Sequence, residues 1–128
     1  MKKILTSESV NIGHPDKTCD FIADSFLDEA LSQDKNSMMA VECAIKNNKL
    51  FIYGEATTKA KIDYEKIARQ ILKEIGYTQD FEIIKEISEQ SPDINQAVVK
   101  TEIYANDQGI VFGYATNETK EYMPLPIL

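Results

Sequence analysis

The stretch that decides the fold runs from Met38 to Thr57 and reads M-M-A-V-E-C-A-I-K-N-N-K-L-F-I-Y-G-E-A-T. On both sides of Asn47-Asn48 the side chains fall into two alternating sets, one of which is apolar. A period of two is typical of β-strands with one buried face. Asparagine tolerates the positive φ of a two-residue type I′ turn. The stretch therefore predicts a β-hairpin with strands over 38–46 and 50–57.

A two-residue turn also decides which side chains share a face of this hairpin. Glu42 is expected opposite Tyr53, and Ala40 opposite Glu55. The two glutamates then become diagonal neighbours on one face, with Cα atoms roughly 7–8 Å apart. The other face, which carries Ile52, is apolar and should be core. Two carboxylates beside small residues could hold a cation or a ligand amine; the alternative is an exposed sheet face with two ordinary glutamates.

Amphipathic helices are expected on both sides of the hairpin. Apolar residues over 15–32 follow the i, i+3, i+4 spacing of a helix that packs on one face. A second helix should begin after Asp63 as its N-cap and stop at Gly76, which favours the left-handed conformation after a helix. The segment 77–89 has a mixed apolar pattern that indicates a strand.

Two further strands are expected near the ends of the chain, at Ile4-Leu5 and over 109–114. The fold class that follows is α+β. It is a two-layer β-α-β-β-α-β unit, followed by a long loop and a last strand, with the helices packed on one face of a mostly antiparallel sheet.

Composition limits the class of protein. The 128 residues are 43% hydrophobic and 27% charged, which is ordinary for one globular domain. A net charge of −7 argues against nucleic-acid and anionic-membrane partners, which need clustered Lys and Arg. The N-terminus lacks the apolar region of a signal peptide, and no apolar run approaches the length of a membrane span, so a cytoplasmic protein is expected. Cys19 and Cys43 fall on apolar faces and are expected to be buried, reduced thiols.

The segment from Thr6 to Lys17 reads T-S-E-S-V-N-I-G-H-P-D-K and precedes the first expected helix. Pro15 suits the first helical position, so the helix should start at His14 or Pro15. Backbone N–H groups at a helix N-terminus favour an anion such as phosphate. Asp16 then has two interpretations: a surface residue that complements the helix dipole, or a ligand of a Mg²⁺ ion that bridges to phosphate oxygens.

Four strings in order resemble the S-adenosylmethionine synthetase (methionine adenosyltransferase) family over nearly the whole chain. They are Thr6–Lys17, Gly54–Thr58, Gln90–Gln96 and Asp107–Glu118. The resemblance covers about the first third of the family's usual length. It implies an amino-terminal domain over 1–103 and the start of a central domain over 104–128.

The resemblance also implies a reaction and a set of roles. Family members join the sulfur of L-methionine to C5′ of ATP, release triphosphate and cleave it to phosphate and pyrophosphate. The catalytic residues would be His14 and Asp107, and ATP would be bound by His14, Lys17 and Asp107. Methionine would be bound by Glu55 and Gln90. The metal ligands would be Asp16 for Mg²⁺ and Glu42 for K⁺.

A mobile loop is implied as well. Its residues are Gln90, Ser91, Pro92, Asp93, Ile94, Asn95, Gln96, Ala97, Val98, Val99 and Lys100. The family's sites are completed by its carboxy-terminal portion and by a partner subunit, so the full-length form is expected to be a homo-oligomer, a dimer or tetramer. The chain departs from the family in its glycine-rich motif, where Tyr104 and Asn106 replace two glycines.

The leading hypothesis is the amino-terminal part of a methionine adenosyltransferase, active only together with its remainder. The rival hypothesis is a non-enzymatic relic or interaction module that keeps the fold and a metal site.

Overall fold

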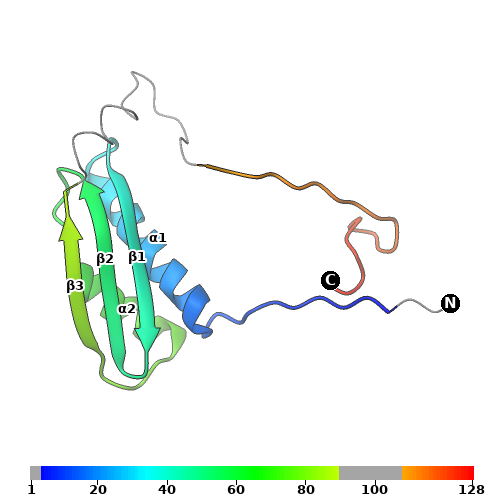
Figure 1. Ribbon diagram of the computed structural model, residues 1–128, viewed down its shortest axis with the longest axis horizontal. Helices are drawn as coiled ribbons and strands as arrows, with labels where there is room; N and C mark the ends of the chain where they lie inside the picture. Colours follow the sequence, from blue (N-terminus) through cyan, green and yellow to red (C-terminus); the bar gives the residue numbers. More distant parts are fainter. Residues whose placement is uncertain (1–3, 90–107) are drawn as a thin grey trace. The chain divides into compact units, whose positions relative to one another are not determined.

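A computed structural model describes residues 4–89 and 108–128 of the chain (Figure 1). The chain divides into two compact units, Asn11–Ile103 on one hand and Met1–Val10 with Tyr104–Leu128 on the other. The helices and strands of the described residues all belong to the first unit, in the order α1, β1, β2, α2, β3. Within these residues, no helix combines the length and apolarity that crossing a membrane requires.

The hairpin forms as the alternation predicts. Strand β1 (Met38–Lys46) pairs antiparallel with β2 (Lys49–Thr57), and Glu42 lies opposite Tyr53. Strand β3 (Glu82–Ser88) joins the far side of β2 in parallel, so the three strands form a mixed sheet in the order β1-β2-β3 (Figure 1). The alternation of buried and exposed residues along β1 and β2 puts one face of the sheet toward the core.

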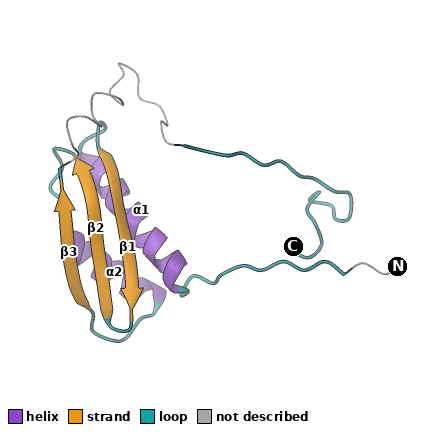
Figure 2. Ribbon diagram, viewed as in Figure 1, coloured by secondary structure: helices purple, strands orange, loops and turns teal. Residues whose placement is uncertain are grey.

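Both helices, α1 (Pro15–Gln33) and α2 (Tyr64–Ile75), cover the same face of the sheet (Figure 2). The core lies between the two layers and consists of side chains that are at most 8% exposed: Ile22, Phe26, Val41, Leu50, Ile52, Ala68, Ile71, Leu72 and Phe81. The α+β class and the two-layer arrangement are therefore confirmed.

Helix α2 begins and ends where the sequence predicts, after Asp63 and before Gly76. The Asp63 carboxylate accepts a hydrogen bond from the Lys66 N–H at 3.1 Å, which satisfies a donor that the first turn leaves unpaired. Gly76 ends the helix with φ of 109°, and its N–H and that of Tyr77 donate to the Leu72 carbonyl. This left-handed stop turns the chain toward β3.

Two expected strands do not form in the described residues. Residues 4–10 and 108–114 are extended but do not form strands (Figure 1). A strand needs a hydrogen-bonded neighbour, and the structure describes none beside either segment. Their apolar side chains stay exposed, with Ile4 at 81% and Val111 at 95%. The Ala105–Asp107 turn expected before the second of these strands lies outside the described residues.

The hairpin turn also differs in type from the expected one. Asn47 has a positive φ of 56°, whereas Asn48 is not among the described residues with positive φ. A type I′ turn needs positive φ at both central residues, and a type II′ turn needs it only at the first. Both types match the twist of the flanking strands, so the pairing register is unaffected by this difference.

The described residues of the second unit, 4–10 and 108–128, contain turns but no helix or strand. The Ser7 hydroxyl donates to the Pro126 carbonyl and so links the two segments of this unit. Around the 116–126 turns, the Leu125 N–H donates to the Glu118 carboxylate at 3.1 Å. The Thr119 hydroxyl accepts a hydrogen bond from the Met123 N–H at 3.1 Å.

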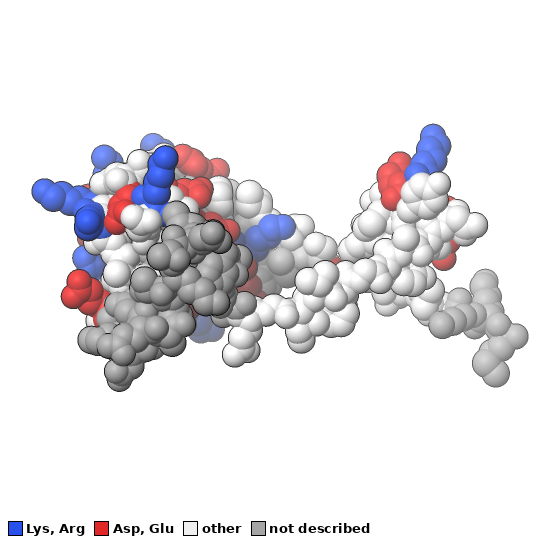
Figure 3. All heavy atoms as spheres, turned by 90° about the horizontal axis from the view of Figure 1, so that it is seen from above, with Lys and Arg blue, Asp and Glu red and all other residues white. Residues whose placement is uncertain are grey.

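The surface and the thiols agree with the composition. On the face seen in Figure 3, acidic and basic side chains are interspersed over the helix and sheet unit. Both cysteines are free thiols, as expected, but only Cys19 is buried, whereas Cys43 is half-buried. Burial raises the pKa of Cys19, and it raises the pKa of Cys43 to about 12. Both side chains are therefore neutral near pH 7.

Candidate functional site

The loop before α1 is held by a hydrogen bond to each of three consecutive carbonyls. The His14 N–H donates to the Asn11 carbonyl at 2.9 Å. The Thr18 hydroxyl donates to the Ile12 carbonyl at 3.0 Å, and the Tyr77 hydroxyl donates to the Gly13 carbonyl at 2.9 Å. These donors come from the loop itself, from α1 and from the segment after α2. The loop conformation is thus determined by local and distant contacts together.

His14 is the N-cap of α1, and Pro15 occupies the first helical turn, as the sequence predicts. The His14 ring caps the helix, because its Nδ1 accepts a hydrogen bond from the Asp16 N–H at 3.2 Å. A ring nitrogen that accepts carries no proton, so in the neutral imidazole the proton is on Nε2. The Nε2–H group is then available as a hydrogen-bond donor, and His14 is exposed to solvent.

Asp16 and Lys17 follow in the first turn of α1, and both are exposed. The helix terminus therefore combines an imidazole donor, a carboxylate and an ammonium group within four residues. The terminus of the 19-residue α1 adds the positive end of the helix dipole. Such a group of side chains suits a phosphate together with a hard cation better than either alone.

The hairpin contributes a second set of side chains, on the sheet face that the helices leave uncovered. Ala40 pairs with Glu55, and the next pair on this face is Glu42 with Tyr53. The two glutamates therefore point the same way, as predicted, with Glu42 exposed and Glu55 half-buried. The opposite face carries buried Ile52 beside Cys43.

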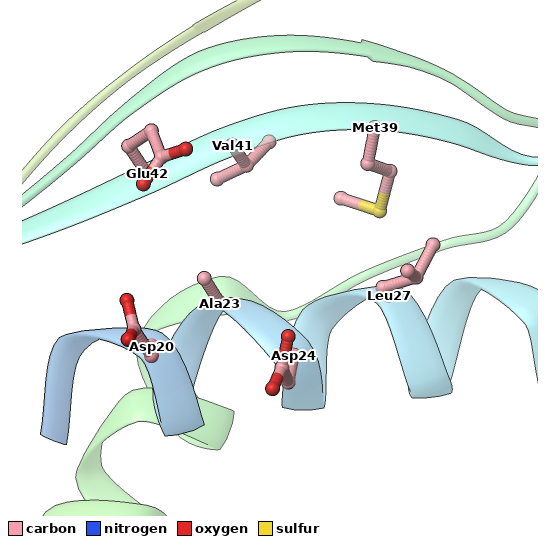
Figure 4. Close-up of a pocket in the computed structure, with 7 residues that line it drawn as sticks. All are labelled: Asp20, Ala23, Asp24, Leu27, Met39, Val41 and Glu42. Atoms are coloured by element: carbon pink, nitrogen blue, oxygen red, sulfur yellow. The ribbon is translucent and has the colours of Figure 1, made fainter. Parts of the chain in front are cut away.

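A groove of about 320 Å³ lies between α1 and the free side of β1 (Figure 4). Met39 and Val41 of β1 point toward Ala23 and Leu27 of α1, so the groove has an apolar interior. Its lining also includes Asp20 and Asp24 of α1, together with Glu42, which follows Val41 in β1 and has its side chain on the other face of the sheet. In the described residues, however, no three His, Cys, Asp or Glu side chains come together as a metal site.

The lack of a three-residue metal site among the described residues also concerns the two expected metal ligands, Asp16 and Glu42. Asp16 and Glu42 each offer a single carboxylate. Mg²⁺ binds through one or two carboxylates when substrate phosphates supply further oxygens, so Asp16 fits a metal that is shared with a nucleotide. Neither residue forms a complete metal site from the residues described.

Comparison with known protein families gives matches over two parts of the chain. The model of the S-adenosylmethionine synthetase N-terminal domain matches residues 2–98. The chain belongs to the S-adenosylmethionine synthetase family. A second model, of the family's central domain, matches residues 102–128.

Curated members of the family are similar over nearly the whole chain. The S-adenosylmethionine synthase of Mycoplasma capricolum is 50% identical over 98% of this chain, which corresponds to 35% of the relative. The S-adenosylmethionine synthases of Akkermansia muciniphila and Mesoplasma florum are 50% and 49% identical and are covered to 36% each. The chain thus spans about a third of the length of the curated relatives it matches.

Several expected site residues lie outside the described residues. These are Gln90 and Asp107, together with the rest of the expected loop over 90–100. The structure brings Glu42 and Glu55 together on one face and His14, Asp16 and Lys17 together at one helix end. The roles assigned to all of these residues by family resemblance stay predictions, as does the division of the chain at 103.

Sequence reasoning missed two residues that hold the loop before His14. Thr18 is fully buried, and its hydroxyl could have been noticed as a polar group on the apolar side of α1. Tyr77 is 64 residues from Gly13 in the sequence, and no periodic pattern links the two. Only the packed structure shows that Tyr77 supports the loop.

Proposed function

We propose that this chain forms the amino-terminal part of a methionine adenosyltransferase, which makes S-adenosylmethionine from ATP and L-methionine. Family membership over residues 2–98 supports this proposal most strongly. The observation in the structure that carries it is the His14 cap, which presents an Nε2–H donor and an adjacent carboxylate at one helix N-terminus. A relic or interaction module would have no need for this arrangement, so we do not favour the rival hypothesis.

The proposed reaction is a displacement at C5′ of ATP. The methionine sulfur donates an electron pair to C5′, the bond from C5′ to the triphosphate oxygen breaks, and that oxygen takes the electron pair. The product sulfur carries a positive charge, and no proton has to be removed. The protein must therefore align sulfur, carbon and leaving oxygen and stabilise the negative charge that grows on the triphosphate.

His14 is well suited to the leaving side of this reaction. Because the Asp16 N–H occupies Nδ1, the imidazole keeps its Nε2 proton for a phosphate oxygen. Lys17 adds a positive charge one turn into the helix. A preorganised donor of this kind is worth about 3–4 kcal/mol of transition-state stabilisation, or roughly 10²–10³ in rate.

Two cations complete the proposed charge balance. Asp16 would hold Mg²⁺ and Glu42 would hold K⁺, and Mg²⁺ would supply positive charge to the triphosphate oxygens. The chain itself carries a net charge of −7, and a triphosphate adds about four negative charges, so these cations and groups from the rest of the enzyme are required. The carboxy-terminal portion and a second subunit of a homo-oligomer are the proposed sources.

The methionine side of the site would be formed by Glu55, which takes the ammonium group, and by Gln90 at the start of the loop over 90–100. Asp107 would lie near the sulfur and the ribose. The half-buried position of Glu55 beside Ala40 supports its role, because a partly desolvated carboxylate binds an ammonium more strongly than an exposed one. A cytoplasmic location is part of the same proposal, since ATP and methionine are available there.

The test uses this chain first alone and then fused to the remaining part of the Mycoplasma capricolum synthase, with ATP, methionine, Mg²⁺ and K⁺. We expect no S-adenosylmethionine from the chain alone and measurable turnover from the fusion. His14→Ala and Asp16→Asn should abolish that turnover, whereas Lys120→Ala, at an exposed position in the other unit, should not.

Three outcomes would contradict the proposal. One is a folded fusion without activity, and another is a fusion whose activity survives both substitutions at the helix terminus. The third is robust methionine-dependent release of triphosphate by the 128-residue chain alone, because that chain lacks the charge to support it.

A further inference from the structure

Gly54 lies in the middle of β2 and has φ of 131°, a conformation that side-chain-bearing residues rarely adopt. It pairs with Val41 on β1. A Cβ atom at this position would come within 2.0 Å of the Ala40 carbonyl oxygen and 3.0 Å of the Ala40 carbonyl carbon. The two strands therefore approach each other more closely here than any other residue at 54 would allow.

The residue that a Cβ atom at position 54 would meet, Ala40, is also the residue opposite Glu55. Ala40 offers its carbonyl oxygen to the space above Gly54, and it is also the cross-strand partner of Glu55, the next residue of β2. Real Cβ atoms essentially never come closer than 3.0 Å to such an atom, so a side chain at 54 would force the strands apart by about 1 Å. Backbone atoms cannot rotate away as a flexible side chain can, so Glu55 would have to move with its strand.

We propose that Gly54 is a positioning residue for Glu55. By allowing the close approach of β2 to the Ala40 carbonyl, it places the Glu55 carboxylate where it receives the methionine ammonium. This inference rests on the proposed function, in which Glu55 binds methionine. Gly54 touches no substrate itself, and its effect passes through the strand to the neighbouring side chain.

The other positive-φ glycine of this unit provides a matched comparison. Gly76 has φ of 109°, but a Cβ atom there would meet nothing within 4 Å. Alanine at position 76 is strained in the same way as alanine at 54, yet it displaces no backbone. The difference between the two positions isolates the steric contact with Ala40 from the general strain of a positive φ.

The experiment compares Gly54→Ala and Gly76→Ala in the fusion described above. Gly54→Ala should lower kcat/KM for methionine about 100-fold, the loss typical of a 1 Å misplacement. Hydrolysis of added inorganic triphosphate, which needs no methionine, should be unchanged. Gly76→Ala should lower Tm without a selective loss of kcat/KM for methionine relative to triphosphate hydrolysis. Equal losses of both activities in Gly54→Ala would overturn the proposal, because they would indicate a general structural role.

Two substitutions of Glu55 separate this inference from the proposed function. If Glu55→Gln leaves kcat/KM for methionine unchanged, the assigned role of Glu55 is wrong and both fall. If Glu55→Gln lowers it and a folded Gly54→Ala does not, only the positioning role is wrong. Should Gly54→Ala fail to fold by circular dichroism, Glu55→Asp decides, since it withdraws the carboxylate by one methylene while Gly54 stays. A fall of about tenfold or more supports the proposal, and no change overturns it.

Discussion

The Tyr77 hydroxyl donates a hydrogen bond of 2.9 Å to the carbonyl oxygen of Gly13, the residue before His14. Tyr77 follows the left-handed stop of α2 at Gly76, and its ring packs edge-on against Phe81, with 5.6 Å between the ring centroids. The Tyr77 side chain thus links the C-terminal end of α2 to the loop before α1. The position of the His14 cap depends on packing at the far end of α2.

Tyr77→Phe should weaken the proposed ATP site without unfolding the protein. The substitution keeps the ring and removes one hydrogen bond, which is worth about 1 kcal/mol net. If the loop must be ordered to bind ATP, kcat/KM for ATP in the fusion should fall about fivefold. Tyr122→Phe, at an exposed position in the other unit, serves as the control and should have no effect. Unchanged ATP kinetics in Tyr77→Phe would show that this contact does not support the site.

Thr18→Val should loosen the same loop from the α1 side. Valine keeps the shape of the fully buried Thr18 but cannot donate to the Ile12 carbonyl. We expect a loss of about 1 kcal/mol in the free energy of unfolding, measured by urea denaturation. Hydrogen exchange of the His14 amide, which is bonded to Asn11, should become faster.

Thr18→Ser is the matched variant for this experiment, because it keeps the hydroxyl and removes the buried methyl group. It should lose a similar free energy of unfolding but leave exchange of the His14 amide close to that of the parent chain. Equal exchange rates in the valine and serine variants would argue that the hydroxyl does not hold the loop.

Cys43 should make the stability depend on alkaline pH. Burial raises its pKa from 9.0 in the unfolded chain to about 12 in the folded one. A raised pKa stabilises the folded state fully below pH 9, where both states are protonated, and this contribution is lost as pH rises from 9 toward 12. The free energy of unfolding of the parent chain should therefore fall more steeply over this range than that of Cys43→Ala. Parallel pH profiles for the two proteins would contradict the burial of the thiol.

Arg69 should stabilise the unit mainly through one bond to the backbone. Its guanidinium donates to the Phe81 carbonyl at 3.1 Å and forms ion pairs with Glu65 and Asp80. Exposed ion pairs contribute little, whereas the carbonyl bond fastens the start of β3 to α2. Arg69→Met should lower Tm more than Glu65→Gln and Asp80→Asn together, as measured by thermal unfolding. A larger effect of the two acidic substitutions would show that the ion pairs contribute more to thermal stability than the bond to the Phe81 carbonyl.

Local patterns in the sequence were sufficient for the elements that are held by near neighbours. The alternation around Asn47-Asn48 predicts the hairpin and its register, because each strand pairs with the residues that immediately follow the turn. Asp63 and Gly76 predict the ends of α2, since both act on backbone groups within one helical turn. Pro15 marks the start of α1 for the same reason.

The tertiary structure alone decided what depends on partners far along the chain. The alternation over 109–114 predicts a strand, but a strand forms only beside another strand, and the described residues offer none there. The parallel docking of β3 on β2, the support of Gly13 by Tyr77 and the close approach of Gly54 to Ala40 are likewise contacts between separate segments. A sequence records which residues can make such contacts, and only packing in three dimensions selects which of them meet.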